Sequence, residues 1–174
     1  MKSISMLFVL AIVLAFGSFA AEANTKPGDN LVEVAIAVNT SGPFAGQFDT
    51  LIAAVIAADP VVINTLSGRG QFTVFAPTDD AFAALGLTPD NVGTLDQETL
   101  TQILLYHVVR GRRDAGAVTT SDQIRSLQGT FFFPNSSATI TDVLGREANI
   151  IVTDVPASNG IIHAIDAVIL PFAP

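Results

Sequence analysis

Cysteine and tryptophan are absent from this chain of 174 residues, and basic residues are few. Without cysteine the chain has no disulfide, no thiolate nucleophile and no cysteine-ligated zinc or iron–sulfur centre. It carries 8 lysines and arginines against 16 aspartates and glutamates, a formal net charge of −8. Because nucleic acids and anionic membranes are also negatively charged, we expect neither as a partner.

Charged residues of both signs make up only 14% of the chain, whereas hydrophobic residues make up 49%. This composition excludes an intrinsically disordered chain and predicts a packed core. The length predicts one domain.

The first 23 residues are typical of a secretory signal peptide. Lys2 gives a positive start, residues 6–16 form an apolar run, and Ala21-Glu22-Ala23 provides small residues where signal peptidase cleaves. A helix of that run spans only about 16 Å, roughly half of a bilayer core, which argues against a membrane anchor. We predict cleavage after Ala23 and no stable membrane insertion afterwards. The protein is then secreted, or lies in the periplasm or on the cell surface if its source is a bacterium.

After the signal peptide we expect a short leader over residues 24–30 and a single domain over residues 31–172. Apolar residues at positions 48, 51, 52, 55 and 56 recur at helical spacing and predict a helix with one buried face. Residues 72–75 and 106–109 are strand-like. The second half consists of apolar and β-branched runs separated by glycine, proline and asparagine. These patterns predict an α+β domain built on a sandwich-like sheet.

Three segments carry a family resemblance. Residues 72–85, FTVFAPTDDAFAAL, resemble the first signature of the fasciclin domain. Residues 104–109, LLYHVV, resemble its Tyr-His stretch, and residues 159–171, NGIIHAIDAVILP, resemble its closing signature. Since the motifs occur in the family's order, the chain resembles a secreted, single-domain fasciclin-like protein. The resemblance implies a fasciclin-like fold, a β-sandwich or wedge of about seven strands packed with several short helices.

Several motif residues have chemistry that suits structural roles. Thr78 can cap the helix that follows the Ala-Pro turn, and Asp79 favours the positive end of that helix. Apolar residues on both faces of the last strand predict that it is central. We therefore expect support of the scaffold from Thr78, Asp79, Phe82, Asn159, Gly160, His163 and Asp166.

We expect no enzymatic activity, no metal site and no cofactor. The chain has 2 histidines, without the spacing of paired metal ligands. Ser158, His163 and Asp166 suggest a catalytic triad at first sight. However, His163 and Asp166 differ by an odd number and face opposite sides of an extended strand. No glycine-flanked serine elbow is present.

A dense basic cluster follows the Tyr-His stretch of this acidic chain. Arg110, Arg112 and Arg113 are either solvated loop residues or a site for an acidic glycan or protein. Together with Tyr106 and His107 they form our candidate interaction surface.

Asn39 and Asn135 begin sequences that fit the N-glycosylation pattern. They are candidate modification sites only if the source is a eukaryote.

Two functions remain open. The resemblance implies a non-enzymatic module for cell-surface or extracellular-matrix adhesion or protein interaction, whose partner is an extracellular protein or glycan. The alternative is a secreted carrier of a small lipophilic ligand such as a carotenoid, which some single-domain, acidic fasciclin-like proteins bind. The abundance of apolar side chains allows this alternative.

Overall fold

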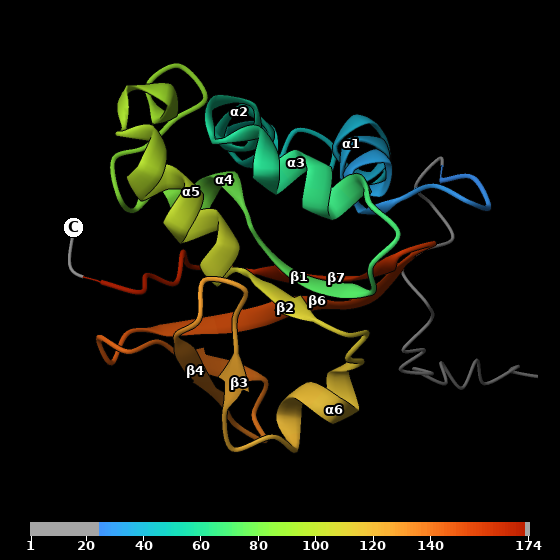
Figure 1. Ribbon diagram of the computed structural model, residues 1–174, viewed down its shortest axis with the longest axis vertical. Helices are drawn as coiled ribbons and strands as arrows, with labels where there is room; N and C mark the ends of the chain where they lie inside the picture. Colours follow the sequence, from blue (N-terminus) through green and yellow to red (C-terminus); the bar gives the residue numbers. More distant parts are fainter. Residues whose placement is uncertain (1–24, 173–174) are drawn as a thin grey trace, which may run out of the picture.

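The computed structural model describes residues 25–172. The predicted signal peptide and its cleavage site lie outside these residues. Figure 1 shows α1 to α5 gathered on one side of strands β1, β7 and β6, with β3, β4 and α6 on the other side. The helices are α1 (Leu31–Thr40), α2 (Asp49–Ala57), α3 (Pro60–Ser67), α4 (Asp79–Ala83), the 3₁₀ turn η2 (Val92–Thr94), α5 (Gln97–Tyr106) and α6 (Ala115–Thr119). The strands are β1 (Phe72–Pro77), β2 (Val108–Arg110), β3 (Ile124–Arg125), β4 (Phe131–Pro134), β5 (Thr139–Thr141), β6 (Glu147–Ala157) and β7 (Gly160–Ile165).

The described strands form one 7-stranded sheet in the order β2-β1-β7-β6-β5-β4-β3. β1 and β7 are parallel, and the other neighbouring pairs are antiparallel. A bridge between Val109 of β2 and Ser126, just after β3, joins the two ends of the order, so the sheet is a nearly closed wedge. The predicted α+β architecture of strands and short helices is confirmed.

The wedge divides the hydrophobic core into two parts that meet at β7. Every residue of β7 is buried. Ile162 and Ala164 belong to the core between the helices and the sheet. Ile165 belongs to a second core inside the wedge, together with Phe75 and Phe132. Because successive side chains of a strand point to opposite faces, a strand between two cores is buried on both faces, as the sequence predicted.

Except for α2 and the 3₁₀ turn η2, each described helix begins at a residue whose side chain accepts a backbone hydrogen bond. Asn30 and Glu33 form a capping box at α1. Asp59 caps α3, and Pro60 occupies its first turn, where no N–H partner is needed. Within residues 25–172, no single helix has both the length and the hydropathy to cross a bilayer. α2 and α3 satisfy that test only as a pair, and they are bent by 115° relative to each other.

The structure corrects two local predictions. α5 continues to Tyr106, and β2 begins only at Val108, so the strand-like segment predicted from residue 106 starts too early. The predicted apolar stripe of α2 is only partly buried. Phe48 and Leu51 lie in the core, but Ile56 at the other end of the stripe is 73% exposed.

Candidate functional site

Two members of the candidate interaction surface lie in the interior, and for them the prediction is wrong. Tyr106 has no exposed area, and its hydroxyl donates to the carbonyl of Phe131 at 2.8 Å. Burial raises the pKa of Tyr106 to about 12. His107 is also buried, because it ends α5 beneath the helix layer.

The hydrogen bonds of His107 define its protonation state. The N–H of Ile169 donates to Nε2 at 3.2 Å, so Nδ1 carries the proton and donates to the carbonyl of Ile103 at 2.8 Å. Burial lowers the pKa of His107 to about 4, and the ring is neutral at pH 7. Both ring nitrogens therefore have partners within the scaffold.

The arginines of the basic cluster have different environments. Arg112 donates from Nη1 to the carbonyls of Gly160 at 3.0 Å and Ala157 at 3.3 Å, where β6 turns into β7. Arg113 is partly buried, and its backbone N–H donates to Thr73 Oγ1 at 2.8 Å. Arg110 is exposed at the end of β2. Arg112 is also exposed, so the cluster has two exposed members, Arg110 and Arg112. The anion site stays a prediction.

The first family motif links two helices as well as capping one. Thr78 accepts from the N–H of Ala81 at 3.4 Å, which confirms its predicted role at α4. Phe82 is buried in the core beneath the helices. The carboxylate of Asp79 accepts from the N–H groups of Thr50 at 2.8 Å and Asp49 at 3.3 Å. Asp79 therefore caps α2 in addition to lying in the first turn of α4.

The turn into β7 holds the helices through Asn159. Its amide donates to the carbonyls of Leu66 at 2.7 Å and Gly68 at 2.8 Å, and its Oδ1 accepts from the N–H of Leu31 at 2.8 Å. These contacts join the end of α3 and the start of α1 to the turn. Gly160 follows, and a Cβ there would collide with the carbonyl oxygen of Phe72.

His163 and Asp166 have separate structural partners. His163 is fully buried, as expected, and stacks on Phe75 with ring centroids 5.4 Å apart. Its Nδ1 accepts from the N–H of Asp154 at 3.2 Å, and its Nε2 donates to the carbonyl of Arg113 at 2.9 Å. Asp166 is exposed and binds Asn149 through both carboxylate oxygens, at 2.7 and 2.9 Å.

The triad arrangement considered from the sequence is not formed, because its three residues have unrelated partners. Ser158 lies in the turn before β7 and donates its N–H to the carbonyl of Asp29 at 2.8 Å. Within residues 25–172, no group of at least 3 acidic or histidine side chains is arranged to hold a metal ion.

The two candidate glycosylation sites differ in their contacts. Asn39 donates from Nδ2 to Asp49 Oδ1 at 2.7 Å, and its Oδ1 accepts from the N–H of Phe48 at 2.8 Å. A glycan on Nδ2 would leave that nitrogen a single N–H with which to bind Asp49. Asn135 is exposed in the turn between β4 and β5. Glycosylation of either residue stays a prediction.

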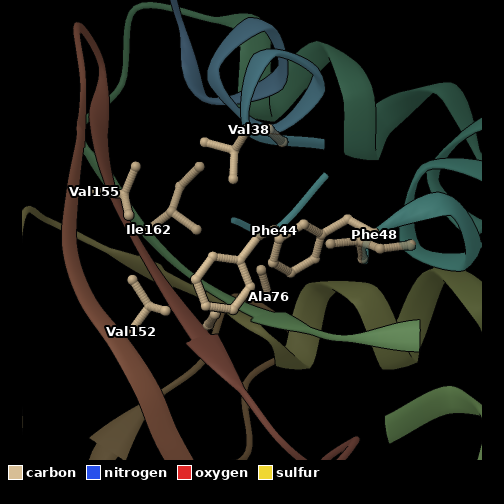
Figure 2. Close-up of a pocket in the computed structure, with 10 residues that line it drawn as sticks. Val38, Phe44, Phe48, Ala76, Val152, Val155 and Ile162 are labelled. Carbon is tan, nitrogen blue, oxygen red and sulfur yellow. The ribbon is translucent and has the colours of Figure 1, made fainter. Parts of the chain in front are cut away.

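Two apolar pockets, which the sequence analysis did not identify, lie next to each other between the helices and the sheet, and we refer to them together as the apolar channel. Its wide part has a cavity volume of about 210 Å³, and its narrow part about 30 Å³. Both parts are lined by Ala35, Leu51, Ala76 and Ile162, so they adjoin. Figure 2 shows the narrow part, in which the Phe44 ring lies between Val152 and Phe48.

The wide part is lined almost wholly by aliphatic side chains of α1, α2 and α3 and by the sheet beneath them. His107 contributes the one ionisable side chain to the lining of this part. Because both nitrogens of its ring are already bonded, His107 presents no vacant polar atom to the cavity. The exposed Ile36 and Ile56 lie among the lining residues, and their exposure follows from this position. One sequence signal was available: α1 and α2 are apolar on more than one face.

Comparison with known proteins identifies the family. The fasciclin domain matches residues 46–171, and the chain belongs to the fasciclin domain family. Protein sll1483 of Synechocystis is 42% identical over 160 residues, covering 86% of this chain and 78% of the relative. Cell surface glycolipoprotein MPB83 of Mycobacterium bovis is 29% identical over 157 residues, covering 88% of this chain and 69% of the relative.

The fold agrees with a solved member of this family, a FAS1 domain pair from the insect cell adhesion molecule fasciclin I. The TM-score is 0.53 at 23% identity, over 67% of this chain and 42% of that chain. This chain covers less than half of the length of that structure, so the similarity shows the fold alone. The fasciclin domain is an adhesion-type domain without enzymatic activity as a family.

Proposed function

We propose that this protein is an exported, non-enzymatic binding module that holds a small lipophilic molecule in the apolar channel. The observation that carries the proposal is the cavity of about 210 Å³, open at the surface and lined by aliphatic side chains. Apolar cavities of about 150 Å³ stay dry and bind molecules such as benzene. The wide part of the channel exceeds that volume.

The lining selects the chemistry of the ligand. Each square ångström of apolar surface removed from water contributes about 25 cal/mol to binding. A charged group inside would be costly, since the lining offers it neither an opposite charge nor a vacant hydrogen-bond donor. The ligand is therefore neutral over its buried length, with any polar group at a mouth. A carotenoid or another long hydrocarbon meets this requirement.

Purification from the native source tests the proposal. We expect a lipophilic molecule to be recovered by organic extraction and identified by mass spectrometry. A carotenoid would also give visible absorption, which the polypeptide alone lacks. The neutral dye Nile red should bind the extracted protein and report on the emptied channel.

A pair of matched variants assigns the binding to the channel. Ala35→Phe places a ring at a residue shared by both parts of the channel, and it should abolish Nile red binding. Ala117→Phe adds the same ring at an exposed position on α6 and should bind the dye normally. The proposal would be refuted if no lipophilic molecule were recovered and if wild type and Ala35→Phe bound the dye equally well.

A second function, adhesion at a cell surface or in an extracellular matrix, is supported by the relatives. The names of MPB83 and fasciclin I place the first at the cell surface and describe the second as an adhesion molecule. The partner would be an extracellular protein or an acidic glycan, with the exposed Arg110 as one contact. Coated beads test this: Arg110→Glu should reduce adhesion to native surfaces, most strongly at low salt. Arg69→Glu, at another exposed arginine, is the control.

A further inference from the structure

The two parts of the apolar channel differ in the aromatic side chains that line them. The shared residues, such as Leu51 and Ile162, line both parts. Phe44 and Phe48 line the narrow part but not the wide part. The part that these rings line has a cavity volume of about 30 Å³, against about 210 Å³ for the wide part. The rings therefore line the constricted part of the channel.

The two rings of this constriction are held differently. Phe48 is only 5% exposed, and its backbone N–H donates to Asn39 Oδ1 at 2.8 Å. Phe44 is partly exposed and comes from the loop between α1 and α2. The centroids of the two rings are 6.3 Å apart, and Figure 2 shows Phe44 reaching across the passage towards Val152. Phe44 therefore obstructs the passage from a loop, whereas Phe48 belongs to the helix layer.

The loop that carries Phe44 has a glycine on either side of the ring. Gly42 has a φ of 93° and Gly46 a φ of 70°, in the left-handed region that favours glycine. The base of the loop is closed by the N–H of Gly46, which donates to the carbonyl of Asn39 at 2.8 Å. Asn39 also binds Asp49 at the start of α2. The ring thus lies on a short flap with a fixed base.

We propose that Phe44 sets the longest ligand that the channel accepts. This inference rests on the proposed lipophilic-ligand function. A straight apolar chain fills the wide part first and reaches the ring of Phe44 as its length increases. Each methylene buried before that point raises affinity roughly fourfold, which corresponds to about 0.8 kcal/mol. Methylenes beyond that point find no further space and add nothing.

Displacement of Nile red by straight-chain primary alcohols of increasing length tests the inference. In wild type, affinity should rise with length and then level off. In Phe44→Ala the short alcohols should bind as in wild type. The affinity should stop rising only at a chain length that is at least about two methylenes greater than in wild type. The longest alcohols should then bind roughly fifteenfold more tightly, which corresponds to two successive fourfold gains. Phe44→Leu should give an intermediate length limit, and it replaces the alanine variant in the test if that variant fails to fold.

The control is Phe131→Ala, which removes an exposed aromatic ring from β4 and should leave the limit unchanged. An identical limit in wild type and in both Phe44 variants would overturn the role of Phe44 but leave the lipophilic site intact. Failure of every alcohol to displace the dye from wild type would overturn the site and the length limit together.

Discussion

The carboxylate of Asp79 accepts the backbone N–H of Thr50 at 2.8 Å, although 29 residues separate them. Thr50 lies in the first turn of α2, whose own N-cap residue, Phe48, provides no side-chain acceptor. The first turn of a helix leaves N–H groups without partners inside the helix. α4 thus supplies to α2 the cap that the local sequence lacks.

We expect Asp79→Ala to lower the free energy of unfolding by about 1–2 kcal/mol, because it removes this cap. Urea unfolding followed by circular dichroism measures the change. Asp80→Ala is the matched control, since Asp80 occupies the same first turn of α4 and is exposed. Equal losses in the two variants would mean that general charge in α4, not the contact with Thr50, accounts for the effect.

Acid should weaken the fold through Asp142. Its side chain has 0% exposure and pairs with Arg146 at 2.6 Å. Burial alone would raise the pKa of Asp142, but hydrogen bonds from Leu170, Arg146 and Leu144 outweigh it and hold the pKa below its usual value. Because the folded pKa is depressed, the contribution to stability is complete above about pH 4, the unfolded value. It is lost as the pH falls through the folded pKa.

The variant Asp142→Asn should lower the free energy of unfolding by about 3 kcal/mol at pH 7, since an amide group would face the Arg146 and Leu170 donors whose hydrogen bonds the buried carboxylate now accepts. Its stability should also vary less below about pH 4 than that of wild type. Denaturant titrations at a series of pH values measure both effects. The exposed Asp122→Asn is the control. A wild-type profile that stays flat below that pH would contradict the assignment.

The two buried histidines should lower the stability of the fold over a higher pH range than Asp142 does. Burial lowers the pKa of His107 to about 4, and burial also lowers the pKa of His163. The unfolded value is about 6.5, so the unfolded chain binds protons that the folded state excludes. The contribution of the histidines to stability is complete above that pH. For His107 it should fall by about 1.4 kcal/mol per pH unit as the pH decreases towards 4, and His163 should add to the slope until the pH reaches its own lowered pKa.

Thermal or urea unfolding between these pH values measures the slope. His107→Gln, which retains a donor and an acceptor, should reduce the slope while His163 remains. A slope unchanged by this substitution would show that His107 does not titrate in the unfolding transition.

Gly160 should tolerate no side chain. In Gly160→Ala the new Cβ would meet the carbonyl oxygen of Phe72 across the parallel pair of β1 and β7. We expect the free energy of unfolding to fall by about 3 kcal/mol or more, because neither backbone can move without breaking the hydrogen bonds between β1 and β7. Soluble yield and urea unfolding measure the effect. Gly93→Ala, whose Cβ would lie 3.6 Å from Ala57, should be nearly neutral, and equal losses in the two variants would contradict this reason.

Several features of the scaffold could be predicted from the sequence because they depend on nearby residues. Thr78 as a helix cap and the doubly buried last strand follow from capping chemistry and from the run of apolar residues. The placement of Tyr106 on a surface was wrong. An aromatic ring beside arginines resembles an interface in one dimension, but the end of α5 directs the ring into the wedge.

The sequence by itself determined the family, the α+β class and the residues that cap helices and form turns, since these depend on local patterns and ordered motifs. The tertiary structure alone decided which partners those residues meet. Arg112 binds carbonyls at the turn into β7, and Asp79 caps a helix that precedes it in the chain. The apolar channel also depends on the tertiary structure. Periodicity marks which helix faces are apolar, but the space left between α1, α2 and the sheet depends on how side chains from distant segments fill it.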